Sequence, residues 1–348
     1  MTTKADIEAI FPSTRFQGSK QKLTAWIWET IQGLKFTTAL DAFGGSGSVA
    51  WLLKKQGKEV IYNDLLKFNW IIGLALIENQ REQLSEAMVD HLLASQPGTT
   101  YPTFIQDTFP GVYFTDEENR WLDMVAANLR EIKNDYQRAL AYFALFQACL
   151  AKRPFNLFHR KNLYLRMSEV KRNFGNKSTW DRPFPALFRK YAAEANQAVF
   201  NNYQKNRAIN LDVFDIYGHY DLVYIDTPYI SNQGTGTDYP GFYHFLEGLV
   251  QYPEWGRLID YQTKHRRLKS FPSVWTSRKE IYPAFDRLFE KFRDSILVVS
   301  YRLDGIPAID ELVGLMKKYK RRVTEIRQYN YKYALSKKET AEVLIVGE

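Results

Sequence analysis

The chain has 348 residues, 45% of them hydrophobic, which supports a sizeable core and argues against disorder. Its first residues lack a basic-then-apolar signal pattern, and no segment reaches the roughly 20 apolar residues of a membrane span, so we expect a cytoplasmic protein with no membrane partner. The formal net charge is +8, and the single cysteine, Cys149, excludes an internal disulfide and is expected in the core.

The first motif in the chain is RFQGSK, residues 15–20, which precedes a predicted amphipathic helix. Gly18 and Ser19 can expose backbone donors at the start of that helix, and Lys20 supplies a cation, so a carboxylate or phosphate could bind there. A solvated lysine near a helix start is the alternative interpretation.

A glycine-rich bend follows a short predicted strand that ends at Asp41. Gly44, Gly45 and Gly47 lie between this strand and a helix that begins near Ser48. Such spacing is typical of a doubly wound fold, in which glycines permit a tight turn and the close approach of a ligand. No Gly-Lys-Ser/Thr follows, so a phosphate-binding P-loop is disfavoured, and a purely structural turn is the alternative.

An acidic residue also follows the second predicted strand, because Asn63 and Asp64 come directly after an apolar run. Asp64 lies about 20 residues beyond the bend, the distance at which an acid reaches the ribose hydroxyls of a bound adenosine. A helix-capping aspartate is the alternative interpretation.

The alternation of strands and helices stops between residues 82 and 187, which indicates an inserted, mainly helical domain. Thr115 and Glu118 form a predicted capping box, and residues 135–153 form a largely buried helix. Residues 153–185 contain too many turn-forming and aromatic residues for one helix, so loops and a hairpin are expected there.

Most of the positive charge is concentrated in this insertion. Between Lys152 and Lys190 the chain has eleven Lys or Arg residues and two acidic residues, interleaved with aromatic side chains. This combination suits a polyanion that also presents flat bases, which is a property of nucleic acids. A solvated basic face is the alternative interpretation.

The alternation resumes after residue 188 and leads to the sequence DLVYIDTPY, residues 221–229. Its apolar run predicts a buried parallel strand, whose carboxyl end faces a ligand crevice. There Asp226 can accept a hydrogen bond, Pro228 fixes the backbone so that a neighbouring carbonyl faces the pocket, and Tyr229 offers a ring for stacking. This set suits an amino group on a planar base, whereas an Asp-initiated turn is the alternative.

The last third of the chain completes an α/β, doubly wound sheet. A strand is predicted over residues 296–301 and a helix over residues 309–319. Residues 323–328 and 341–347 are expected to pair as an antiparallel C-terminal hairpin at one edge of the sheet.

Four motifs, RFQGSK, DAFGGSGSV, IYND and DTPY, stand in this order around a basic insertion, and the set resembles the DNA adenine methylase family. The resemblance implies S-adenosyl-L-methionine as cofactor, N6 of adenine in double-stranded DNA as methyl acceptor, and flipping of that adenine out of the duplex. It also implies a Rossmann-like catalytic domain formed by residues 1–81 and 188–348. Residues 82–187 would be an inserted target-recognition domain.

The resemblance further assigns roles to individual residues. The cofactor would be held by Phe16, Gly18, Ser19, Lys20, Asp41, Phe43, Gly44, Gly45, Gly47 and Asp64. Asp212 is a further cofactor candidate from its position alone, because it closes a predicted strand and is followed by Phe214 near the same crevice. A turn-forming aspartate and a core phenylalanine are the alternative. The catalytic tetrad would be Asp226, Thr227, Pro228 and Tyr229, in which Thr227 departs from the usual DPPY but keeps the backbone carbonyl that is thought to act. The run KRPFNLF, with Asn156, looks like the family's DNA-facing insert, but individual DNA contacts are not carried over from the family. From the basic charge of the insertion we expect DNA to be contacted by Arg153, Asn156, Arg160, Lys161, Arg166, Lys171, Arg172 and Lys177. No metal is needed for this chemistry.

The expected function is therefore site-specific methylation of adenine in DNA, either as an orphan enzyme or beside a cognate restriction endonuclease, in the cytoplasm and associated with the nucleoid. An RNA adenine N6-methyltransferase would use the same pocket and is one alternative. A non-catalytic DNA-binding regulator that retains the cofactor fold is the other.

Overall fold

The computed structural model describes residues 8–168, 177–232, 234, 236–269, 272–331 and 340–348. The chain divides into two compact units. The helical unit consists of Met1–Phe16, Leu74–Asn201 and Pro240–Ser270. The sheet unit consists of Gln17–Gly73, Asn202–Tyr239 and Phe271–Glu348.

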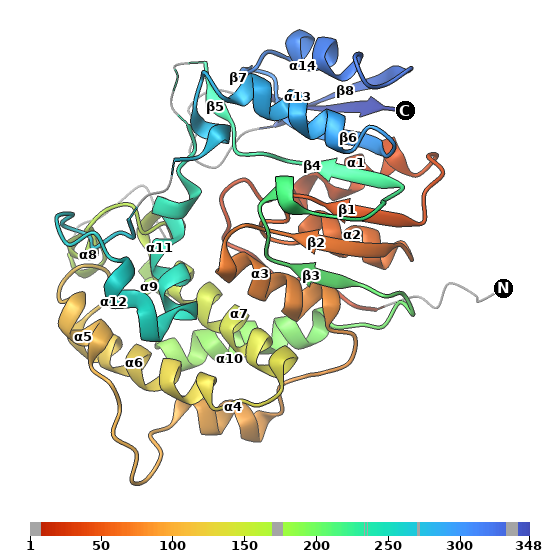
Figure 1. Cartoon of the computed structure of the whole chain (residues 1–348). Helices are drawn as coiled ribbons and strands as arrows, with labels where there is room; N and C mark the ends of the chain where they lie inside the picture. Colours follow the sequence, from red (N-terminus) through yellow and green to blue (C-terminus); the bar gives the residue numbers. More distant parts are fainter. Residues whose placement is uncertain (1–7, 169–176, 233, 235, 270–271, 332–339) are drawn as a thin grey trace. The chain divides into compact units, whose positions relative to one another are not determined.

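The sheet unit is built on seven strands in the order β3-β2-β1-β4-β6-β9-β8 (Figure 1). Their bounds are Thr38–Asp41 (β1), Glu59–Asn63 (β2), Arg207–Ile209 (β3), Leu222–Ile225 (β4), Ile296–Arg302 (β6), Val323–Tyr331 (β8) and Thr340–Gly347 (β9). The strands from β3 to β6 are parallel, while β9 pairs antiparallel with both β6 and β8. This confirms the doubly wound sheet and its antiparallel C-terminal hairpin.

Helices cover both faces of this sheet, with α2 and α13 on opposite faces (Figure 1). The helices of the unit are α1 Thr24–Ile31, α2 Ser48–Lys55, α3 Lys67–Gly73, α13 Ile281–Lys291 and α14 Ile309–Met316, with 3-10 turns at Gln21–Leu23, Val213–Asp215 and Val274–Thr276. A small ladder joins β5 Ile230–Ser231 to β7 Gly305–Ile306. The central strand β4, with the sequence LVYI, is accordingly apolar, as is typical of a strand covered on both faces.

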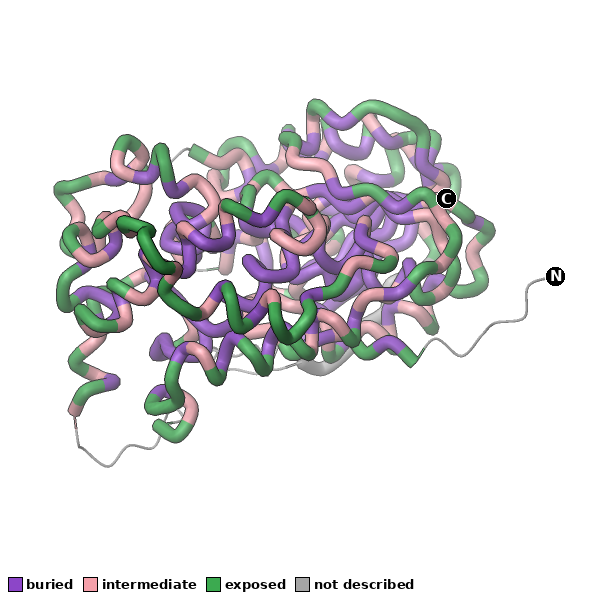
Figure 2. Tube along the Cα trace, turned by 90° about the horizontal axis from the view of Figure 1, so that it is seen from below, coloured by how far each residue is buried: buried purple, intermediate pink, exposed green. Residues whose placement is uncertain are grey.

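The central strand β4 is buried at all four of its positions. Val223 belongs to the same buried cluster as Val299 of β6 and Phe285 and Leu288 of α13. Figure 2 shows how buried residues gather along the strands while the outer turns of the helices are exposed. Such burial holds the carboxyl end of β4 in one position, and that end carries the DTPY sequence.

The helical unit contains the expected helices of the insertion. These are α4 Glu86–Leu93, α5 Phe104–Thr108, α6 Asp116–Arg130, α7 Asp135–Ala151, α8 Leu163–Met167, α9 Lys177–Trp180, α10 Phe184–Ala198, α11 Tyr239–Val250 and α12 Trp255–Leu258, with a π-helical turn at Leu74–Glu78 and 3-10 turns at Pro154–Asn156 and Tyr252–Glu254. The predicted capping box at Thr115 and Glu118 is confirmed at the start of α6. None of the helices in the described ranges is long and apolar enough to cross a membrane.

The hairpin expected within residues 153–185 is not found among the residues described there, and short helices take its place. At the start of this segment the buried Arg153 donates its guanidinium N–H groups to the carbonyls of Leu157 and Arg160. These bonds favour a compact turn around Arg153 over an extended strand in residues 153–160.

An aromatic core joins the insertion to the segment after DTPY. The rings of Phe158 and Phe245 stack with centroids 5.0 Å apart, and Trp255 meets Phe245 edge-on at 5.0 Å. The helical unit therefore includes Pro240–Ser270, which the sequence analysis placed with the catalytic part. The division of the chain into a catalytic and a recognition domain stays a prediction.

Gly248 of α11 offers a test of this core. A Cβ atom at Gly248 would lie 1.9 Å from Cε2 of the fully buried Trp255, so Gly248→Ala should lower the free energy of unfolding by about 1–3 kcal/mol. Gly314 of α14 has no atom within 4 Å of such a Cβ. Gly314→Ala is the matched control and should leave the melting temperature equal or higher, because alanine favours a helix. Equal melting of the two variants would contradict the packing described.

Candidate active site

The glycine bend between β1 and α2 can be formed only by small residues. Gly45 and Gly47 have φ angles of 51° and 75°, which L side chains rarely adopt. A Cβ atom at Gly44 would lie 2.0 Å from Cε2 of the buried Tyr62. Gly44 also donates its N–H to the carbonyl of Asn63 at 2.8 Å, so the bend is fastened to the end of β2.

Asp64 connects the bend to the next helix. One carboxylate oxygen accepts from the N–H of Gly45 at 2.9 Å, and the other accepts from the N–H of Leu66 at 2.8 Å. Burial raises the pKa of Asp64 to about 6, although these backbone bonds oppose the shift. The bond to Leu66 resembles a helix cap, yet each oxygen has a second lone pair for a ligand. The ribose role of Asp64 stays a prediction.

Asp41 lies buried at the end of β1. Its Oδ2 accepts from the N–H of Ala50 at 3.1 Å, and its Oδ1 has no hydrogen-bond partner among the residues that the structure describes. Burial raises the pKa of Asp41 to about 8, and the charges of Asp226 and Asp64 add to the rise. A buried oxygen without a hydrogen bond lowers the stability of the fold, and a hydrogen bond from a ligand to this oxygen would restore part of that stability.

Residues 17–20 reach both the bend and the tetrad. The hydroxyls of Ser19 and Ser46 lie 2.9 Å apart, and Nζ of Lys20 lies 2.8 Å from each carboxylate oxygen of Asp226. Gly18 has a φ angle of 83°. Residues 17–20, the bend and the tetrad thus lie together at the carboxyl edge of the parallel strands, the edge at which ligands bind in sheets of this kind.

Phe16, the first aromatic residue of the same motif, belongs to the helical unit. There its ring stacks on Tyr243, with centroids 4.7 Å apart and planes 8° apart. Its predicted contact with the cofactor is untested.

The tetrad follows β4 directly. The side chain of Asp226 is 21% exposed, and burial raises its pKa to about 6, with Lys20 opposing the rise and Glu342 adding to it. Thr227 is buried, and its hydroxyl has no partner among the described residues. The half-buried Pro228 leads to Tyr229, whose ring lies 4.7 Å below the guanidinium of Arg302.

Asp212 and Phe43 lie beside an aromatic group rather than in the polar cluster. The exposed Asp212 accepts from the N–H of Phe214, at the start of a 3-10 turn. Phe214 stacks on Trp275, and Phe43 meets Trp275 edge-on at 5.2 Å. Trp275 belongs to the buried cluster of the sheet unit, and Phe43 and Phe214 pack against that cluster. The cofactor contacts of Phe43 and Asp212 stay predictions.

Glu342 of β9 contacts this candidate site and was not singled out from the sequence. Its Oε1 lies 3.4 Å from Nζ of Lys20 and accepts from the hydroxyl of Ser300 at 2.6 Å. The available signal was a single acidic residue in the otherwise apolar run 341–347.

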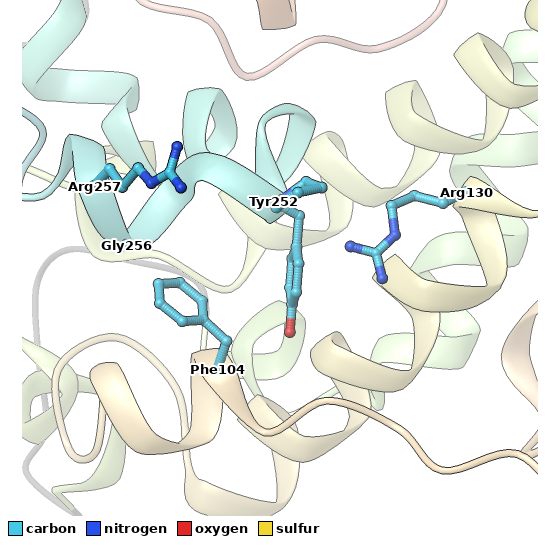
Figure 3. Close-up of a pocket in the computed structure, with 6 residues that line it drawn as sticks. Phe104, Arg130, Tyr252, Gly256 and Arg257 are labelled. Atoms are coloured by element: carbon cyan, nitrogen blue, oxygen red, sulfur yellow. The ribbon is translucent and has the colours of Figure 1, made fainter.

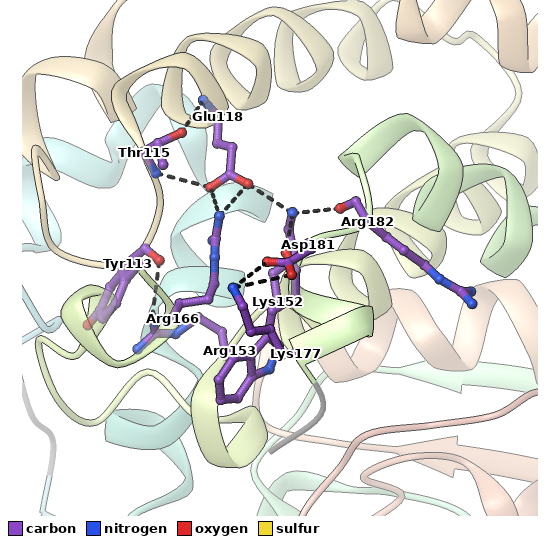
Figure 4. Close-up of polar contacts among 10 residues, drawn as sticks. Tyr113, Thr115, Glu118, Lys152, Arg153, Arg166, Lys177, Asp181 and Arg182 are labelled. Atoms are coloured by element: carbon purple, nitrogen blue, oxygen red, sulfur yellow. Dashed lines mark hydrogen bonds and ion pairs between the residues drawn. The ribbon is translucent and has the colours of Figure 1, made fainter. Parts of the chain in front are cut away.

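Two of the predicted DNA contacts, Arg153 and Arg166, bind other residues inside the helical unit (Figure 4). Arg166 donates to Glu118 at 2.6 Å, and Lys152 pairs with the same carboxylate at 2.9 Å. Burial opposes the ionisation of Glu118, but these two cations hold its pKa below the usual range. Arg153 is buried as well and donates to the carbonyl of Tyr113 at 3.1 Å, and burial lowers its pKa to about 9.

The remaining predicted contacts differ in exposure. Arg160, Lys161 and Lys177 are exposed, and Lys177 pairs with Asp181 at 3.3 Å. Asn156 is half-buried. Lys171 and Arg172 lie outside the described residues.

A pocket of about 520 Å³ lies within the helical unit (Figure 3). It is lined by Phe104, Arg130, Tyr252, Pro253, Gly256 and Arg257. The guanidinium of Arg130 lies 4.6 Å from the ring centre of Tyr252. No residue of the predicted site lines this pocket.

Comparison with known proteins gives one family. The family described as D12 class N6 adenine-specific DNA methyltransferase matches residues 16–251. Type II methyltransferase M2.HphI of Haemophilus parahaemolyticus is 30% identical over 340 residues, which cover 95% of each chain. Type II methyltransferase M.FokI of Planomicrobium okeanokoites is 27% identical over 88% of this chain and 47% of its own. Type II methyltransferase M.NlaIII of Neisseria lactamica is 24% identical over 87% of each.

The raised pKa of Asp41 predicts a pH dependence of stability. The carboxyl has a pKa of about 8 in the fold against 3.8 in a free chain, so folding favours its protonated form. Its stabilising effect is complete at acidic pH and is lost as pH rises towards about 8, at a cost on the order of a few kcal/mol. In Asp41→Asn, the free energy of unfolding measured by chemical denaturation should decline less as pH rises. The control Asp215→Asn, at an exposed position, should decline as wild type does.

Proposed function

Because the chain belongs to the D12 class of N6 adenine-specific DNA methyltransferases, we propose that it methylates a flipped-out adenine with S-adenosyl-L-methionine as the methyl donor. The observation that supports this most is the pair of Lys20 and Asp226, with the carboxylate partly exposed at the end of β4. The amino nitrogen of adenine is a poor nucleophile, so methyl transfer mainly requires a group such as Asp226 that accepts a hydrogen bond from that amino group.

The chain's own residues suit the proposed cofactor. The bend has the glycines that a doubly wound fold uses for its tight turn, with φ angles of 51° at Gly45 and 75° at Gly47, and Asp64 offers acceptors for ribose hydroxyls. When bound, S-adenosyl-L-methionine supplies an electrophilic methyl group on a sulfonium. Asp41, with its unpartnered oxygen, can accept a hydrogen bond from the cationic end of such a molecule.

The tetrad would act on the adenine. Asp226 accepts one hydrogen of the amino group and the backbone carbonyl of Thr227 accepts the other, which favours a tetrahedral nitrogen. Tyr229, fixed from above by Arg302, stacks on the base. The amino proton lost after methylation is placed on Asp226, the acceptor that already contacts it.

We also propose that the enzyme works in the cytoplasm beside a cognate restriction endonuclease. The support is that M2.HphI, M.FokI and M.NlaIII are all Type II methyltransferases. DNA from cells that express the protein should then resist cleavage by that endonuclease.

The test of the function is expression in cells that lack DNA methylation, followed by sequencing for N6-methyladenine. Wild type should methylate adenine at one sequence, and Asp226→Ala should abolish methylation while DNA affinity stays within a few-fold, because only the acceptor is removed. Asp215→Ala is the control, since that side chain is exposed. Product on structured RNA but not on duplex DNA would favour an RNA methyltransferase, and DNA binding without any product would favour a regulator.

The DNA surface gives a separate prediction. Replacing the exposed Arg160, Lys161 and Lys177 by alanine should lower affinity for all sequences and reduce the slope of log affinity against log salt by about 0.9 for each phosphate that is no longer neutralised. Lys133→Ala, exposed between α6 and α7, is the control of equal charge. Arg153 and Arg166 are not proposed as contacts, because their guanidiniums hold the helical unit together. Unchanged salt dependence in all three variants would place DNA recognition elsewhere.

A further inference from the structure

We propose that Glu342 is a positioning residue for methyl transfer, which holds the ammonium of Lys20 so that Asp226 keeps a carboxylate oxygen available for the adenine amino group. This inference rests on the function proposed above. It concerns a residue far from the four motifs in sequence, on the last strand of the sheet.

The geometry consists of one buried cation between two carboxylates. Nζ of Lys20 lies 2.8 Å from both oxygens of Asp226 and 3.4 Å from Oε1 of Glu342. The side chains of Lys20 and Glu342 are only 7% and 1% exposed. The hydroxyl of Ser300 donates to the same Oε1 at 2.6 Å, which fixes the carboxylate of Glu342 from the other side.

The topology of the sheet explains how β9 reaches this place. Because β9 runs antiparallel to β6, its first residues lie beside the carboxyl end of β6, and Glu342 pairs in register with Arg302. Val343 and Ile345 belong to the buried cluster on one face of the sheet. Side chains alternate along a strand, so Glu342 lies on the opposite face, where Lys20 is found.

The stability of the sheet alone does not explain why residue 342 is a glutamate. Burial of a second carboxylate beside the Lys20–Asp226 pair adds a desolvation cost that the pair by itself does not have. Lys20 and Asp226 alone would already form a neutral pair. The extra carboxylate is therefore better explained by what it does to Lys20 than by stability.

The advantage appears when the amino group arrives. Without Glu342, the ammonium of Lys20 would donate only to the two oxygens of Asp226, and these are the oxygens that accept the hydrogen bond from the adenine amino group. Glu342 offers the ammonium another acceptor, so that one oxygen of Asp226 can turn to the adenine. Lys20 remains protonated and close, and it continues to stabilise the ionised carboxylate.

The same arrangement predicts the pH dependence of the reaction. The groups that face Asp226 are Lys20 before α1, Glu342 of β9, Asp41 of β1 and Tyr224 of β4. Burial raises the pKa of Asp226 to about 6, Lys20 opposes the rise and Glu342 adds to it. Loss of the charge at Glu342 therefore lowers this pKa.

The decisive experiment compares Glu342→Gln with wild type in steady-state methylation of duplex DNA by the full chain across pH. We expect kcat to fall by about 10- to 100-fold because the oxygen of Asp226 is misplaced, with KM for DNA little changed. The acidic limb of kcat, near pH 6 in wild type, should move to lower pH. A merely structural role would lower kcat without moving this limb.

Two further variants complete the test. Glu290→Gln on the exposed side of α13 is the matched control and should behave as wild type. If Glu342→Gln does not fold, Ser300→Ala provides the test. This variant keeps the charge of Glu342 but removes the hydroxyl that donates to its carboxylate. We expect kcat to fall in this variant as well. Wild-type kcat and pH profile in Glu342→Gln, or wild-type kcat in Ser300→Ala when the first variant is unfolded, would overturn the proposal. A wild-type protein without methylation would instead overturn the proposed function.

Discussion

The proposed active site depends on keeping one carboxylate ionised at the end of a buried strand. Asp226 loses much of its hydration there, and the chain compensates with Lys20, a residue 206 positions earlier. The sheet order makes this pairing available, because β1 and β4 are neighbours and their carboxyl ends form one edge. The glycine bend, the tetrad and the segment before α1 then meet without any long loop.

The sequence predicted the parts of this site that follow general rules of parallel sheets. Asp41, Asp64 and Asp226 were all found as acids at strand ends, and the structure places each at the carboxyl edge. Glu342 was not predicted, because an acid within an apolar strand gives no sign of the cation opposite it. The number of basic residues in the insertion did not show that Arg166 is buried whereas other cations lie on the surface. Its partner Glu118 lies 48 residues away in the sequence, so the ion pair could not be predicted from neighbouring residues.

The charge balance of the sheet edge limits which ligand it can take. Asp64 and Asp226, whose pKa values are both about 6, are mainly ionised at neutral pH, whereas a pKa of about 8 leaves Asp41 mainly protonated. The ammonium of Lys20 contacts Asp226. Such an edge disfavours a polyphosphate, even though its glycine bend resembles those that bind nucleotides. It suits a cofactor that is itself positively charged, as the proposed sulfonium is.

The aromatic core of the helical unit bears on how this chain can be recombined with its relatives. The unit is drawn from separate stretches, and Phe158 of the insertion packs on Phe245, which follows the tetrad. A graft that exchanges Leu74–Asn201 alone would separate these rings and leave Trp255 against a foreign surface. To keep these ring contacts, Leu74–Asn201 and Pro240–Ser270, which lie on either side of the DTPY strand in the sequence, must be exchanged together.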